Sequence, residues 1–167
     1  MAGALDGVRV IDFGQYIAGP LAAQLLGDQG AEVIRIDPPP SVQRWDTPTN
    51  ATFNRGKRSI VLDLKSDDGR GAARALIASA DVVIENFRPG VMDRLGLGAI
   101  VMIEANPRLI YCSLPGFAAD DPRAAMPAWE GIVGAAAGMY RAARGGTPTN
   151  GRPIFSAIPL PSSYAAI

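Results

Sequence analysis

The hydrophobic pattern alternates between two kinds of segment along most of the chain. Short runs rich in β-branched residues, each followed by a turn residue, a proline or a charged residue, are typical of strands buried in a parallel sheet. The runs cover residues 8–13, 32–37, 59–64, 81–86 and 109–113. We interpret these runs as the strands of one sheet.

Helical patterns separate the runs. Apolar residues on one face, together with a proline in the first turn or a capping serine before it, favour helices that cover a sheet. The predicted helices cover residues 19–29, 66–77, 92–95, 99–104 and 129–143. The polar stretch from Pro38 to Gly56 predicts a long loop. This alternation defines an α/β chain with right-handed crossovers.

Charge and composition narrow the range of functions. The chain has 16 Lys and Arg residues against 16 Asp and Glu residues, so no net charge draws it toward nucleic acid or a membrane. It shows neither a secretory signal nor a membrane span, and we expect a cytoplasmic protein. One cysteine and no histidine exclude an internal disulfide, a histidine-dependent triad and the common zinc sites, so no metal is expected.

Two loops follow predicted strands at the place where open α/β sheets bind ligands. Residues 14–20 lack both the lysine of a P-loop and the glycines of a dinucleotide site. Residues 85–90 bring together an amide, an aromatic ring and a guanidinium, with Arg94 one turn further on. Such groups can bind a phosphate or stack on a nucleotide base. The alternatives are a plain strand-to-helix turn for the first loop and a solvated loop for the second.

Two further features bear on chemistry. Residues 54–58 form a basic cluster that contains Lys57 and Arg58, which is either a second phosphate contact or a solvated run of charge. Cys112 lies in a predicted strand without a basic neighbour, so we interpret it as a buried, unreactive thiol.

Six motifs, in order along the chain, carry a resemblance to a known family. They are Val10–Phe13, Ala18–Pro20, Gly30–Asp37, Asn54–Ile60 with Leu62–Leu64, Glu85–Gly90 with Asp93–Gly96, and Asn106–Ser113 with Gly116–Phe117. Together they resemble the family III CoA-transferases, a family that also contains the α-methylacyl-CoA racemases. The resemblance spans most of residues 5–117 and is weaker from residue 118 onward.

The resemblance implies a Rossmann-like open parallel sheet flanked by helices, formed by residues 1–144, that binds coenzyme A. Residues 145–167 are then a linker and the start of a truncated helix, leading toward a second domain that this sequence lacks. The implied reaction moves CoA between an acyl-CoA and a carboxylic acid. The family's subunits interlock like rings, so we expect a homo-oligomer or a partner chain that completes the fold, with no nucleic-acid or membrane partner.

The resemblance and the loop positions together give a candidate CoA site. Its first group comes from the loop after the first strand and consists of Gln15, Tyr16, Ile17 and Ala18. Its second group follows the fourth strand and consists of Asn86, Phe87, Arg88 and Arg94. Lys57 and Arg58 are candidates for a further phosphate contact.

The expected nucleophile is absent from its place. The resemblance implies an aspartate that attacks the acyl-CoA thioester, within a Pro-x-x-Asp pattern after an Ala/Gly-rich segment. The corresponding stretch is Pro159–Tyr164, where Ser162 takes the aspartate's place, and no aspartate follows Asp121. A serine without a histidine is a poor substitute for a carboxylate. The sequence assigns no catalytic residue, and we expect no CoA-transferase turnover from this chain alone.

Three alternatives stay open. The chain is a non-catalytic acyl-CoA-binding relative, or a racemase-like isomerase, or a dinucleotide-binding domain that uses Asp37. A racemase needs proton acceptors on both faces of the α-carbon, which the absence of histidine disfavours. A dinucleotide site needs the glycine fingerprint that residues 14–20 lack.

Overall fold

The protein contains a five-stranded, all-parallel open sheet with the strand order β3-β2-β1-β4-β5. This architecture comes from a computed structural model that describes residues 3–41, 48–140 and 158–167. The strands are β1 (Arg9–Asp12), β2 (Glu32–Asp37), β3 (Arg58–Val61), β4 (Val82–Glu85) and β5 (Ile110–Ser113). The predicted α/β fold class, an open parallel sheet flanked by helices, is confirmed.

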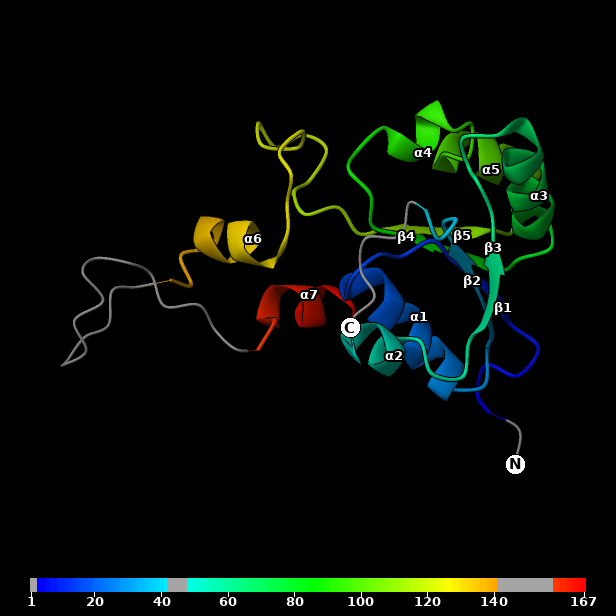
Figure 1. Cartoon of the computed structure of the whole chain (residues 1–167), viewed down its shortest axis with the longest axis horizontal. Helices are drawn as coiled ribbons and strands as arrows, with labels where there is room; N and C mark the ends of the chain where they lie inside the picture. Colours follow the sequence, from blue (N-terminus) through cyan, green and yellow to red (C-terminus); the bar gives the residue numbers. More distant parts are fainter. Residues whose placement is uncertain (1–2, 42–47, 141–157) are drawn as a thin grey trace.

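Helices cover both faces of the sheet (Figure 1). One side carries α1 (Ala18–Asp28), α2 (Pro48–Phe53) and α7 (Leu160–Ala165). The other side carries α3 (Asp67–Ala78), α4 (Val91–Arg94) and α5 (Ala99–Ala105). Helix α6 (Glu130–Ala136) lies away from the sheet and packs against α7, which in turn packs against α1.

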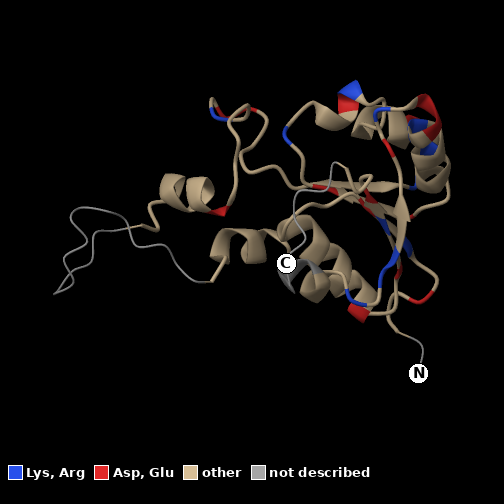
Figure 2. Cartoon of the chain, viewed as in Figure 1, with Lys and Arg blue, Asp and Glu red and all other residues tan. Residues whose placement is uncertain are grey.

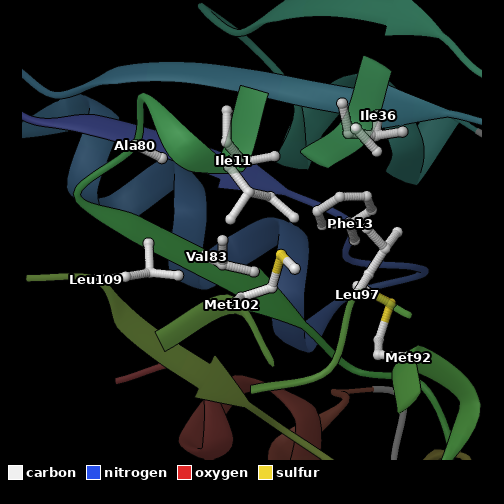
Figure 3. Packing of buried hydrophobic residues seen from close by; sticks show 11 residues of the cluster. Ile11, Phe13, Ile36, Ala80, Val83, Met92, Leu97, Met102 and Leu109 are labelled. Carbon is white, nitrogen blue, oxygen red and sulfur yellow. The ribbon is translucent and has the colours of Figure 1, made fainter. Parts of the chain in front are cut away.

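The alternation of side chains along the strands divides the core into two parts. On the α3 and α5 side, Ile11 and Phe13 of the β1 segment pack with Val83 and Met102 (Figure 3). On the α1 side, Val10 packs with a second set of apolar residues, made up of Ala23, Val33 and Ile84. The same alternation directs Asp12 toward α1, where its carboxyl group is completely buried. This buried charge becomes the centre of the candidate site.

The order of the strands creates a reversal point between β1 and β4. From β1 the chain moves outward through β2 and β3, then returns to place β4 on the other side of β1. Ligands of open α/β sheets bind outside the carboxyl ends of the strands at such a point. The loops that begin at Gly14 and Asn86 follow β1 and β4, so both leave the sheet there.

Two segments differ from the prediction. The stretch from Pro38 to Gly56 is not a loop throughout, because α2 forms within it. The helix expected over 129–143 is also shorter: α6 ends at Ala136, since Gly138 adopts a left-handed conformation with φ 71° and the Met139 amide bonds back to the Gly134 carbonyl. The predicted linker begins at 145 and lies, up to residue 157, outside the described residues.

Candidate functional site

A tight turn joins β1 to α1 and depends on Asp12. One carboxylate oxygen of Asp12 accepts a hydrogen bond from the Gly14 amide at 2.7 Å. A Cβ at Gly14 would lie within 2.7 Å of the Asp12 carboxylate, the Gly19 carbonyl carbon and the Pro20 ring. Only glycine fits this close approach, which brings the loop back onto the start of the helix.

Lys57 neutralises Asp12 in the interior. Its Nζ lies 2.7 Å from the other carboxylate oxygen of Asp12, 2.7 Å from the Pro20 carbonyl oxygen and 3.0 Å from Asn54 Oδ1. Only 2% of the Lys57 side chain is exposed. Burial lowers the pKa of Lys57, and the neighbouring Asp12 carboxylate opposes that shift. All three ammonium hydrogens therefore have acceptors within the chain.

Asn54 extends the buried network to β2. Its Oδ1 also accepts a hydrogen bond from Arg35 at 2.7 Å, and the Nε of Arg35 pairs with Asp37 at 2.6 Å. Asn54 and Lys57 therefore tie the segment before β3 to the ends of both β1 and β2. Two residues of the basic cluster, Asn54 and Lys57, therefore form a buried clasp beneath the loop.

Asn86 joins the two predicted loops directly. Its Oδ1 accepts a hydrogen bond from the Gln15 amide at 2.7 Å, and its Nδ2 donates to the Gln15 carbonyl at 2.8 Å. Tyr16, which follows Gln15, has φ 66° and is 46% exposed. A non-glycine residue with positive φ is strained by about 1–3 kcal/mol and persists where its surroundings fix it. The amide clamp of Asn86 supplies that constraint.

The remaining loop residues lie close by in the chain but differ in exposure. Ile17 is buried, Ala18 is half-buried, and the Phe87 ring packs against the core on the α3 side. Arg88 and Arg94 are exposed, and the guanidinium group of neither forms an ion pair or hydrogen bond with the residues that the structure describes. These two guanidinium groups are therefore available to an anion.

Arg58 lies apart from the other candidate residues. It begins β3 and pairs with Glu32 at 2.7 Å, at the amino end of β2. Arg55 pairs with Asp28 at the end of α1. Figure 2 shows basic and acidic segments side by side along this part of the molecule. Lys57 thus lies against the loop after β1, whereas Arg58 lies at the amino ends of the strands.

A buried carboxyl group closes the end of β4. Glu85 accepts hydrogen bonds from the Ser113 hydroxyl and from the Phe87 amide. Burial raises the pKa of Glu85, and the two hydrogen bonds oppose that shift. Cys112 on the neighbouring strand is half-buried, not fully buried as the sequence predicted, because β5 is an edge strand. Its partial burial still raises the pKa of the Cys112 thiol, which disfavours the reactive thiolate.

The structure also reveals a pair of residues that the sequence analysis did not connect. Ser162 of α7 donates two hydrogen bonds to one oxygen of Glu130, from its amide at 3.0 Å and from its hydroxyl at 2.5 Å. Glu130 is the only acidic residue after Asp121. This single acidic residue could have been found in the sequence, but the resemblance directs attention to aspartates alone.

The described residues contain no group of three side chains suited to hold a metal ion. Within the same ranges, no helix has the length and hydrophobicity required to cross a membrane.

Comparison with known proteins defines the class. The model of CoA-transferase family III matches residues 5–167, and the chain belongs to this family. The family resemblance inferred from the sequence motifs is thereby confirmed.

Individual relatives show how far the similarity extends. The CoA-transferase/lyase DddD of Marinomonas sp. is 47% identical over 163 residues, which are 96% of this chain and 19% of that protein. The human alpha-methylacyl-CoA racemase is 45% identical over 68% of this chain and 28% of its own length. A crystal structure of the Mycobacterium tuberculosis protein Rv3272 superposes with a TM-score of 0.87 at 40% identity, covering 99% of this chain and 47% of that one. The chain thus spans less than half the length of these relatives.

Replacement of Lys57 tests the buried clasp. Lys57→Met leaves the Asp12 charge buried without a partner, so the free energy of unfolding should fall by about 3–5 kcal/mol in urea titrations. Asp12→Asn added to Lys57→Met should recover part of this loss, because the uncompensated charge disappears. Arg58→Met removes a surface pair and should have little effect. Equal losses from Lys57→Met and Arg58→Met would contradict the assignment.

The raised pKa of Glu85 predicts that the stability of the fold depends on pH. Because the folded state raises its pKa above the ordinary 4.5, Glu85 favours folding most at pH below 4.5, and this contribution is lost as pH rises through the raised pKa. As pH increases across this window, the original chain should therefore lose stability relative to Glu85→Gln, measured as the difference between their free energies of unfolding. The exposed Glu104→Gln serves as the control and should show no such trend. A pH-independent difference for Glu85→Gln would exclude the shift.

Proposed function

We propose that this chain is the CoA-binding portion of a family III CoA-transferase, and that it binds CoA or an acyl-CoA at the carboxyl ends of β1 and β4. The observation that carries the proposal is the clamp between Asn86 and Gln15, which unites the two loops at the reversal point of the sheet. The reaction class is transfer of CoA between an acyl-CoA and a carboxylic acid, because the chain belongs to that family.

The charges of the site suit the ligand. CoA carries phosphate groups at one end and an uncharged pantetheine arm at the other. Arg88 and Arg94 supply two exposed guanidinium groups without a partner among the described residues, and guanidinium groups bind phosphates through charge-assisted hydrogen bonds. The backbone of Gln15–Ala18, held in place from β4, suits the approach of the pantetheine arm. In this proposal Asn86 and Lys57 position the loop, and Phe87 supports it from the core.

The family contains two reaction types, and the chain favours one of them. Relatives named for CoA transfer include the acetyl-CoA:oxalate CoA-transferase of Acetobacter aceti, which is 42% identical over 84% of this chain. The racemase relative keeps the isomerase function as an alternative. The absence of histidine removes the most common proton acceptor from this chain, and we therefore propose CoA transfer. Because relatives are longer, we further propose that additional polypeptide, from a longer protein or a second subunit, completes the working enzyme.

Titration calorimetry with CoA tests the proposal. The chain should bind CoA, and Arg94→Ala should weaken binding by about 1–3 kcal/mol, because a charge-assisted contact with a phosphate is lost. Arg108→Ala is the matched control, since Arg108 is exposed and lies just before β5, at the amino ends of the strands. A folded chain that neither releases heat nor gains thermal stability with CoA or acetyl-CoA would refute the proposal. Equal effects of the two arginine substitutions would remove Arg94 from the site.

A further inference from the structure

The pair formed by Glu130 and Ser162 brings a carboxylate to the part of the fold where the sequence left the nucleophile unassigned. Glu130 begins α6 and Ser162 lies on α7, 32 positions away in the sequence. Helix α7 packs against α1, the helix that begins directly after the Gln15–Ile17 loop. Figure 2 shows the acidic start of α6 next to an α7 that carries no charge. The carboxylate thus belongs to the layer that adjoins the proposed CoA site.

The two oxygens of Glu130 have different surroundings. Oε2 accepts both hydrogen bonds from Ser162, at 3.0 Å from the amide and 2.5 Å from the hydroxyl. Oε1 accepts no hydrogen bond from the described residues. One oxygen is therefore held by two donors, and the other keeps its lone pairs for an incoming group.

We infer that Glu130 is the acyl acceptor of this chain, with Oε1 as the attacking atom and the two Ser162 donors as an oxyanion hole for Oε2. The inference rests on the proposed function, because it requires an acyl-CoA at the site. Glu130 is then a catalytic residue, and Ser162 assists it through hydrogen bonds.

The chemistry balances without an external base. Oε1 forms a bond to the thioester carbonyl carbon, the carbon–sulfur bond breaks, and CoA leaves as a thiolate, which produces a mixed anhydride. The thiolate then attacks the carbonyl carbon of Glu130, the anhydride carbon–oxygen bond breaks, and the acyl group departs as a carboxylate. The product is a glutamyl–CoA thioester. During this second step, negative charge develops on Oε2, where both Ser162 donors already point.

Two other candidate nucleophiles, Ser162 and Asp121, are worse. The Ser162 hydroxyl donates a hydrogen bond to Glu130, and a serine ester cannot carry CoA as a thioester. Asp121 accepts three hydrogen bonds from Arg123, two from its guanidinium and one from its amide, and these contacts lower the pKa of Asp121 to about 2. Both oxygens of the Asp121 carboxylate are held by Arg123, which makes it a weaker nucleophile than an oxygen that accepts no hydrogen bond.

Single-turnover labelling tests this inference. The chain is incubated with acetyl-CoA or butyryl-CoA, then treated with borohydride, which reduces a glutamyl thioester to an alcohol. Peptide mass spectrometry of the original chain should locate the alcohol at Glu130, a result that does not depend on any variant. Glu130→Gln should abolish the label, and Glu104→Gln, an exposed change on α5, should leave it intact. Ser162→Ala should slow formation of the thioester about a hundredfold, because one oxyanion donor is lost.

Parallel calorimetry with CoA separates the two claims. A label at Glu130 supports the inference. Binding of CoA without a label, or with the label on another residue, would overturn the role of Glu130 while the proposed CoA site stands. Failure of the folded chain to bind CoA or acyl-CoA, with no label, would overturn both.

Discussion

The buried pair of Asp12 and Lys57 is the constraint on which the candidate site depends. A carboxylate that is completely removed from water needs a partner, and the ammonium 2.7 Å away provides it. The same carboxylate holds the Gly14 amide, and the same ammonium holds the Pro20 carbonyl. One charge pair therefore fixes the end of β1, the turn after it and the first turn of α1.

A second constraint comes from the neighbouring strand. Asn86 satisfies both the amide and the carbonyl of Gln15, so the loop after β1 and the loop after β4 behave as one unit at the reversal point of the sheet. This restraint explains how Tyr16 keeps a strained backbone at an exposed position. Rigid loops lose little conformational entropy when a ligand binds, which favours recognition of a flexible molecule such as CoA.

The sequence predicted the sheet well because each strand is a short β-branched run with a clear end, as in Glu32–Asp37. It also predicted that the loops after β1 and β4 matter, since position along the chain determines which loops meet at the carboxyl edge. The individual roles were harder to predict. Lys57 and Arg58 are adjacent in sequence, yet the former is buried beneath the loop and the latter lies at the far edge. The contact of Glu130 with Ser162 joins distant segments and required the tertiary structure.

In our proposal the Asp12–Lys57 charge pair and the amide clamp of Asn86 build a CoA site at the carboxyl ends of β1 and β4. A crystal structure of the chain with bound CoA tests it most directly. We predict CoA phosphates within hydrogen-bond distance of Arg88 or Arg94, and the pantetheine arm along the backbone of Gln15–Ala18, with the contacts of Asn86 and Lys57 preserved. CoA bound at the amino edge of the sheet, near the pair of Arg58 and Glu32, would contradict the claim.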